Sequence, residues 1–440
     1  MKQLCLLLCL LTFGFSSFRA QSKTVPVTKA WAGNSVNAVV FRKNSLVTYK
    51  NIQFIAFYNQ KGKLTLGKRK LNTSKWEIVE TAFSGNIHDA HNCISIMVDG
   101  EGFLHVSWDH HGNPLNYAHS VAPLSLELTD KMPMTGLNET NATYPEFYKM
   151  SNGNLIFLYR DGRSGKGNLV MNRYDVKSKA WTQLHTNLID GEGRQNAYWQ
   201  ACVDKKGTFN ISWVWRGSPD VASNHDMLFA RSTDGGISWE KSTGEKYMLP
   251  INEANAELAC SIPRNSELIN QTSMTTDEGG NPFIASYWRS ANSTVPQYHI
   301  VYNTGNKWKE LNLGFRTTPF SLSGVGTKRI PISRPQVLAR GKGDKASIRL
   351  FFRDSERSDK VSVAVCNHIA QNKWQVSDLT NFGVGSWEPT YDTELWKDKK
   401  CLHLFVENVQ QVDGEGVAKA PQPEMVNVLE VDLLISAIRY

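Results

Sequence analysis

One phrase recurs seven times along the chain: an apolar strand, an aromatic residue, and then a polar or charged loop. The copies are FIAFYNQKG (54–62), LHVSWDHHG (104–112), LIFLYRDG (155–162), FNISWVWRG (209–217), FIASYWRS (283–290), IRLFFRDS (348–355) and LHLFVENVQ (402–410). Apolar and polar positions alternate, with turn residues between them, which is typical of antiparallel strands. Seven such units of about four strands each predict an all-β fold, a seven-bladed β-propeller.

One unit carries a more specific marker, the segment STDGGISW at residues 232–239. It has the S-x-D-G-G-x-x-W form of the Asp-box (BNR) turn of sialidase-like propellers. We expect Asp234 and the two glycines to form a tight turn between strands, with Trp239 packed beneath it. This motif predicts the fold and says nothing about the function.

The first residues, MKQLCLLLCLLTFGFSSFRA, have the basic start, short apolar core and small polar end of a secretory signal. We therefore expect residues 1–20 to be removed and residues 21–440 to form one propeller that is exported, periplasmic or secreted. The apolar run is too short to span a bilayer, and no later run is long enough, so no membrane partner is expected. The formal net charge of +8 suits an acidic ligand, and no nucleic-acid motif is present.

Four of the chain's 11 histidines lie between residues 90 and 114. His105 lies within a strand pattern, whereas His91 opens a strand and His110 and His111 follow one. Superposing the repeats puts His111 at the position of Arg216, and arginines hold comparable positions elsewhere. We expect these residues to share the central funnel and to bind an anion: His110, His111, Arg160, Arg216, Arg289 and Arg334.

A uronate in this funnel makes β-elimination chemically accessible. The carboxylate charge must be neutralised, a base must remove the C5 proton, and an acid must protonate the departing O4. These functions can be supplied by His91, His111, Tyr159 and an arginine, without a metal or cofactor. A divalent cation bound by the histidines and an oxygen of Asp109 is an alternative. Two readings compete: a glycoside hydrolase, which needs two carboxylates from Asp89, Asp109, Glu146 and Glu388, and a propeller that binds a glycan without cleaving it.

The segments HDAHNCISIMVDGEGFLHVSWDHHGNPLNY and YPEFY…NLIFLYRDGRSGKGNLVMNRYD resemble the BNR-repeat propellers of glycan degraders. Within that group the chain looks most like the L-rhamnose-α-1,4-D-glucuronate lyases, first described as α-L-rhamnosidases, and more distantly like the propeller ulvan lyases. The resemblance implies an exo-acting enzyme that removes rhamnose caps from arabinogalactan-type glycans and leaves an unsaturated uronate. It places the catalytic histidines at His91 and His111, the tyrosine at Tyr159 and the carboxylate-binding arginine at Arg173, with Tyr144 and Arg160 as competitors. We expect the enzyme to be a monomer.

The chain departs from the family's pattern at one position. Members often read VTHG where this chain reads VTYK, and that histidine was assigned to a hydrolytic site on the opposite face of the propeller. Tyr49 stands there in this chain. Because the His91 and His111 positions are intact, this difference favours the lyase reading or a binder without activity.

Overall fold

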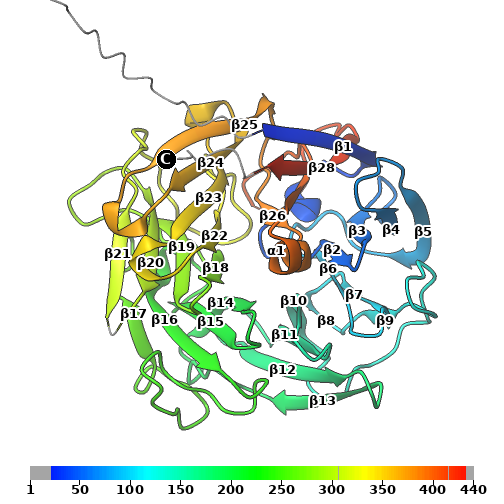
Figure 1. The fold of residues 1–440 in the computed structure, drawn as a ribbon, viewed down its shortest axis with the longest axis horizontal. Coiled ribbons are helices and arrows are strands. Elements are labelled where there is room, and N and C mark those ends of the chain that lie inside the picture. The colour runs from blue at the N-terminus through cyan, green and yellow to red at the C-terminus, as the bar shows by residue number, and fades with distance from the viewer. Residues whose placement is uncertain (1–20, 306, 415, 433–440) are drawn as a thin grey trace, which may run out of the picture.

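The computed structural model describes residues 21–305, 307–414 and 416–432. They form seven antiparallel sheets arranged around a central axis, as Figure 1 shows. The all-β, seven-bladed propeller expected from the repeats is therefore confirmed. The predicted export signal, residues 1–20, lies outside the described residues.

The first three blades follow one another along the chain. Blade 1 consists of β2 (Leu46–Tyr49), β3 (Ile52–Tyr58), β4 (Lys63–Lys70) and β5 (Glu77–Ser84). Blade 2 consists of β6 (Ile94–Val98), β7 (Leu104–Trp108) and β9 (Tyr117–His119). Blade 3 consists of β10 (Ala142–Lys149), β11 (Leu155–Asp161), β12 (Asn168–Asp175) and β13 (Ala180–His185), and the short β8 (His111–Asn113) pairs with β10. Strand β8 therefore ties the loop of blade 2 to the innermost strand of blade 3.

The next three blades repeat this order from the axis outward. Blade 4 consists of β14 (Asn196–Val203), β15 (Phe209–Arg216), β16 (Asn224–Ser232) and β17 (Glu257–Cys260). Blade 5 consists of β18 (Ser273–Thr276), β19 (Pro282–Trp288), β20 (Gln297–Asn303) and β21 (Trp308–Asn312). Blade 6 consists of β22 (Gln336–Arg340), β23 (Ser347–Arg353), β24 (Lys360–Cys366) and β25 (Gln375–Gly383).

Blade 7 closes the ring with strands from both ends of the described chain. It consists of β26 (Thr390–Tyr391), β27 (Leu402–Val406), β28 (Glu424–Asp432) and β1 (Gln21–Ala30). Strand β1 pairs with β28 from Gln21 opposite Asp432 to Ala30 opposite Glu424. This pairing leaves the ring without a free seam, which is how propellers protect their edges.

Helices are few and short. The single α-helix in the described ranges, α1 (Thr393–Lys399), follows β26 beside the axis (Figure 1). The 3-10 turns are Ser35–Asn37, Val221–Ser223, Gly343–Lys345, Ser355–Arg357 and Ile369–Gln371. None of the helices in these ranges is long and apolar enough to cross a membrane.

The Asp-box has the predicted geometry. Both oxygens of Asp234 accept the backbone N–H of Ser238, at 3.0 and 3.1 Å, and the side chain of Trp239 is fully buried. The indole N–H of Trp239 donates to the carbonyl of Gly236 at 3.1 Å, so the turn and the core below it are joined. Gly236 has a φ of 93°, a conformation that glycine adopts without steric cost.

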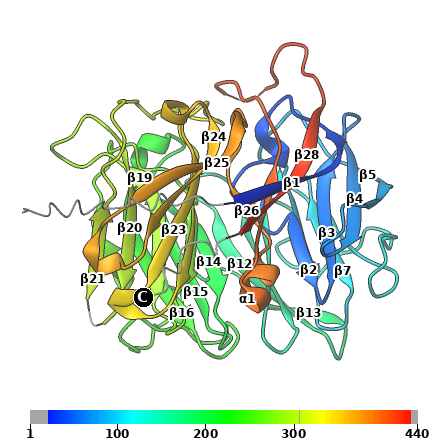
Figure 2. The same ribbon diagram turned by 45° about the horizontal axis from the view of Figure 1, so that its top comes forward.

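The innermost strands position both mouths of the central channel. The first strands of blades 2 to 6 start on one face of the ring and end on the other. Each residue of a strand advances the chain by about 3.3 Å. Figure 2 shows α1 on one face and the loop that leads into β28 on the opposite face. Side chains just before or at the start of these strands therefore meet at one mouth, and those at their ends meet at the other.

Candidate active site

A cavity of about 1000 Å³ occupies the mouth where the innermost strands start. We call it the histidine cavity. Its chemistry-bearing lining residues are His91, His111, Tyr144, Arg160, Tyr198, Arg216, Arg334, Arg353 and Glu388. Four of the predicted arginine and histidine positions, His111, Arg160, Arg216 and Arg334, thus share one mouth with His91, as the superposed repeats indicated.

The two histidines twenty residues apart lie face to face. Their rings stack with centroids 4.0 Å apart and an angle of 18° between the planes. Asp89 lies against both: its Oδ1 is 2.8 Å from His91 Nδ1, and its Oδ2 is 2.5 Å from His111 Nδ1. Phe41 stacks on the other side of His91 at 5.7 Å. The pair is therefore fixed by one carboxylate and one aromatic ring.

This carboxylate determines how the histidines present themselves. Burial raises the pKa of Asp89, but the hydrogen bonds from His111 and His91 outweigh burial, and the pKa lies well below its ordinary value. An ionised carboxylate only accepts hydrogen bonds, so each Nδ1 must carry the proton. In the neutral ring, Nε2 is then the basic nitrogen.

Asp89, His91 and His111 also satisfy the spacing of a cation site. Their ligand atoms all lie within 4.8 Å of one another. A cation there would have to replace the protons that Asp89 shares with the two Nδ1 atoms. The same three groups are thus already matched to one another by hydrogen bonds.

Two tyrosines from neighbouring blades face the histidines. Tyr144 lies near the start of β10 and its ring is 6.0 Å from the ring of His91, while Tyr198 lies near the start of β14, 5.9 Å from Tyr144. Tyr144 has a φ of 60°, and the pairing of β10 with β11 shifts register between Thr143 and Glu146. A left-handed tyrosine costs of order 1–3 kcal/mol, and such strain gathers at functional sites.

Arg160 lies between the two tyrosines, whose pKa values are shifted in opposite directions. Its guanidinium donates to the Tyr198 hydroxyl at 3.2 Å and lies 5.0 Å over the ring of Tyr144. Burial alone would raise the pKa of Tyr198, but Arg160 and Arg216 outweigh burial, and the pKa lies below its ordinary value. Burial raises the pKa of Tyr144 well above its ordinary value. Paired groups with opposite shifts are the usual arrangement of a base and an acid.

Arg216 and Arg334 differ in whether a carboxylate already pairs with the guanidinium group. Arg216 stacks 5.1 Å over the ring of Tyr198 and donates its Nε to a backbone oxygen, that of Ser218, at 3.1 Å. Arg334 instead forms a two-pronged pair with Glu388, with Nε to Oε1 at 2.8 Å and Nη2 to Oε2 at 2.6 Å. Arg216 and Arg160 thus keep their positive charge available to a ligand, whereas Glu388 compensates Arg334.

Four residues placed in the site by the sequence lie elsewhere. His110 is fully buried, its Nε2 accepts the N–H of Asn116 at 2.8 Å, and burial lowers its pKa to about 3, so it is a neutral acceptor and binds no anion. Tyr159 is buried in the blade core and donates to the carbonyl of Leu137 at 3.3 Å. Arg173 lies on β12, two strands outward from the innermost strand.

Arg289 is the fourth of these residues. Its Nε pairs with Glu267 at 2.6 Å and its Nη2 donates to the carbonyl of Asn265 at 2.7 Å, so loop contacts use its donors. Strand order accounts for Arg173 and an ion pair for Arg289, whereas strand alternation accounts for Tyr159. Successive residues of a strand point to opposite sides, so Tyr159 and Arg160 face different blades, and a shift of one position removes a residue from the cavity.

Sequence reasoning missed the position of three contributors to the site. Tyr198 was not singled out, Phe41 was not considered, and Asp89 entered only as a hydrolase carboxylate. A signal was available for Tyr198. It stands two residues inside its innermost strand, as Tyr144 does in the preceding blade. Superposing the first strands of the repeats as well as the second would have placed both tyrosines at one mouth.

The fold and the site define a propeller with a cationic cavity lined by histidine and tyrosine at one mouth. The chain belongs to the BNR repeat-containing family, whose profile matches residues 52–315.

Relatives with assigned names are distant and cover part of the chain. An ulvan lyase of Alteromonas sp. (strain LOR) is 24% identical in an alignment of 303 positions that covers 60% of this chain and 61% of that protein. The protein named Ulvan Lyase-PL25 of Pseudoalteromonas sp. (strain PLSV) is 24% identical in an alignment of 256 positions that covers 51% of this chain and 52% of that protein. The chain thus spans between half and two thirds of the length of these curated relatives.

Solved structures share the fold over nearly the whole chain. A polysaccharide lyase of family PL25, an ulvan lyase bound to -[GlcA(1-4)Rha3S]-, aligns with a TM-score of 0.67 at 14% identity and covers 90% of this chain and 97% of its own. The polysaccharide lyase Uly1 aligns with a TM-score of 0.63 at 14% identity, over 94% and 99% of the two chains. At this identity the likeness establishes the shared propeller.

Proposed function

We propose that this chain is a polysaccharide lyase that cleaves a 4-linked uronate by β-elimination in the histidine cavity. One observation carries the proposal. A single cavity combines arginines suited to a carboxylate with a histidine pair and with two tyrosines whose pKa values are shifted in opposite directions. The relatives that bear the name ulvan lyase support the same reaction class.

The proposed reaction assigns one task to each group. Arg216, with the histidines in their protonated form, neutralises the uronate carboxylate, which makes the C5 proton acidic. Tyr198, whose pKa is lowered, removes that proton. The electron pair of the C5–H bond forms the C4–C5 double bond, the C4–O4 bond breaks, and O4 takes a proton from Tyr144, which burial keeps neutral. Proton exchange with solvent restores both tyrosines.

The proposed substrate is a glucuronate linked to rhamnose. The chain's resemblance to the rhamnose–glucuronate lyases suggests an exo-acting enzyme that removes L-rhamnose from arabinogalactan-type caps. The glycan in the bound relative, -[GlcA(1-4)Rha3S]-, also joins glucuronate to rhamnose, although as a repeating chain. We therefore propose the rhamnose–α-1,4-glucuronate linkage as the first substrate to test, with sulfated ulvan fragments as the second.

The carboxylates argue against a hydrolase. Hydrolysis needs one carboxyl group as acid and one as nucleophile or base. Among the described lining residues, Glu388 is the only carboxylate, and Arg334 holds both of its oxygens. Beside the cavity, Asp89 is bound to two histidines, and Glu146 is buried between Tyr148 and Trp199.

The proposal also covers the export of the chain, its oligomeric state and its cofactor requirement. We propose that the signal-like residues 1–20 send the chain to the periplasm or the medium, and that the mature propeller acts as a monomer without a cofactor. Its partner is an acidic polysaccharide. N-terminal sequencing of the protein recovered from the periplasm, together with light scattering of that sample, would test the first two points.

Ultraviolet absorbance during incubation with a rhamnose-capped arabinogalactan tests the proposal, with sugar analysis of the same sample. Rising absorbance with released rhamnose means that a C4–C5 double bond is forming. Released rhamnose without absorbance would overturn the lyase reading in favour of hydrolysis. An intact glycan, with both this substrate and ulvan fragments, would leave the chain as a binder.

A further inference from the structure

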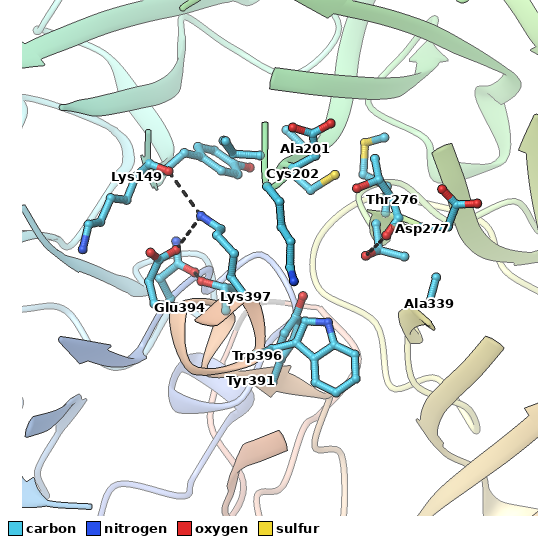
Figure 3. Close-up of a pocket in the computed structure, with 18 of the residues that line it drawn as sticks. Lys149, Ala201, Cys202, Thr276, Asp277, Ala339, Tyr391, Glu394, Trp396 and Lys397 are labelled. Atoms are coloured by element: carbon cyan, nitrogen blue, oxygen red, sulfur yellow. Dashed lines mark hydrogen bonds and ion pairs between the residues drawn. The ribbon is translucent and has the colours of Figure 1, made fainter. Parts of the chain in front are cut away.

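A second cavity lies at the opposite mouth of the channel. We call it the lysine cavity; it encloses about 950 Å³. Its wall contains the ends of the strands whose starts line the histidine cavity, including Lys149 of β10 and Cys202 of β14, and α1 covers one side (Figure 3). Tyr144 and Lys149 are five residues apart on β10, so the two cavities are separated by roughly 16 Å.

The positive charge of this cavity comes from lysines alone. Its basic lining residues are all lysines: Lys43, Lys149, Lys205, Lys206, Lys397 and Lys400. Within the described part of the chain, Lys397 alone among them has a carboxylate within 4.0 Å, Glu394 at 2.9 Å. Figure 3 shows the Lys397 ammonium between Glu394 and the backbone oxygen of Lys149. Five ammonium groups therefore gather without an ion-pair partner.

The cavity's four acidic residues are fewer than its six lysines. Asp204 accepts the backbone N–H groups of Lys206 and Thr208, both at 2.8 Å. Asp277 accepts three backbone N–H groups, those of Gly279, Asn281 and Gly343, at 2.6–3.0 Å. These two carboxylates hold turns together, Glu394 pairs with Lys397, and Glu278 partly offsets the charges around Lys400. The lysines remain in excess, so the cavity keeps a net positive charge.

The mutual repulsion of the cations is visible in their acidities. Burial lowers the pKa of Lys149 and of Lys400. In Lys400 the nearby charges of Lys205, Arg340 and Lys397 lower the pKa further, while Glu278 raises it. Lys400 also lies 5.0 Å over the ring of Trp396, which holds its stem against an apolar wall. An anion placed among these ammonium groups would relieve this repulsion, and the apolar wall would strengthen the attraction.

We propose that the lysine cavity is a binding site for a tetrahedral oxyanion, a sulfate or phosphate monoester group. The contrast with the other mouth favours this chemistry. The histidine cavity carries planar guanidinium groups, the type that matches a carboxylate, whereas an ammonium is a point charge that suits the evenly spread oxygens of a tetrahedral anion. The site does not depend on the lyase proposal, because it shares no lining residue with the histidine cavity.

The same chemistry has two sources, a sulfate ester on a glycan chain or free inorganic phosphate. Calorimetric titration of the mature protein at low salt separates them, with a sulfated uronate oligosaccharide, its desulfated counterpart and inorganic phosphate as probes. The His111→Ala variant is used throughout, so that the oligosaccharide is not consumed. Tighter binding of the sulfated than of the desulfated oligosaccharide assigns the site to glycans; equal binding of the oligosaccharides with binding of phosphate assigns it to the free anion.

Paired variants locate the binding. Lys205→Gln/Lys400→Gln removes two unpaired cations of the cavity, and Lys61→Gln/Lys70→Gln removes the same charge from exposed lysines of blade 1. We expect the first pair to raise the Kd of the bound anion by about tenfold or more, since two charge-assisted contacts are removed, and the second pair to leave it unchanged. Failure of both anions to bind, or equal Kd values for the two pairs, would overturn the proposal.

Discussion

Replacing Asp89 by asparagine tests the role of the carboxylate that is hydrogen-bonded to both His91 and His111. The asparagine oxygen still accepts one Nδ1–H, but its NH₂ group faces the other Nδ1, so one histidine must change tautomer or turn away. A hydrogen bond to a charged group contributes about 1.5–3 kcal/mol. If about 2–3 kcal/mol of that is needed in the transition state, the rate falls roughly 30- to 150-fold at 1.36 kcal/mol per factor of ten.

The assay is the initial rate of uronate double-bond formation, measured as kcat and KM separately. We expect the loss in kcat, with KM changing little, since Asp89 acts through the histidines. Asp109→Asn is the matched control: Asp109 Oδ1 accepts the N–H of Asn86 at 2.7 Å, and an asparagine oxygen accepts the same donor. Wild-type kcat in Asp89→Asn, or an equal loss in Asp109→Asn, would refute the positioning role.

The same variant has a pH signature in stability. The pKa of Asp89 in the folded protein lies below that of an unfolded aspartate, about 3.9. Its contribution to the free energy of unfolding is therefore fully present above that value and is lost as the pH falls toward the folded pKa. Denaturant unfolding should show wild type more stable than Asp89→Asn at neutral pH, with the difference shrinking in acid. A difference that grows in acid would contradict the assignment.

Tyr198→Phe should lower kcat by about 100-fold or more, the usual contribution of a general base, and should abolish the rise of activity with pH, because the base must lose its proton and its pKa lies below that of an ordinary tyrosine. Tyr159→Phe, which alters a hydroxyl bound to a backbone oxygen in the blade core, should keep wild-type kcat; a loss equal to that of Tyr198→Phe would reassign the base. Arg216→Ala should raise KM at least tenfold for the uronate glycan, as one charge-assisted contact is removed, and an unchanged KM would place carboxylate binding elsewhere. Dialysis against a chelator should leave activity intact, and loss that is restored by a divalent cation would turn Asp89, His91 and His111 into a metal site.

The fold was predictable from the chain because a propeller repeats its information seven times. Each copy carries the same apolar strand and turn, and the Asp-box adds a turn whose hydrogen bonds require Asp234 and two glycines. His91 and His111 were also accessible, since a strand, a turn and a returning strand bring residues twenty apart together. Repetition thus compensates for the weak signal of any single strand.

The remaining site residues were harder to predict because strand register decides which side a residue faces. Tyr159 and Arg160 are neighbours in sequence, yet Arg160 lines the cavity and Tyr159 lies in the core. The left-handed backbone at Tyr144 and the register shift beside it place that ring, and no local sequence pattern announces either. His110 lies in the loop between β7 and β8, where no strand alternation indicates that it is buried.

The most direct test of the central claim is mass spectrometry of the products formed in water enriched in heavy oxygen. β-Elimination breaks the C4–O4 bond without adding water, so the account predicts an unsaturated uronate end that carries no heavy oxygen, and its formation should stop in His91→Ala and His111→Ala. A saturated uronate end would contradict the account and assign hydrolysis instead, in which the water oxygen adds to C1 of the released rhamnose.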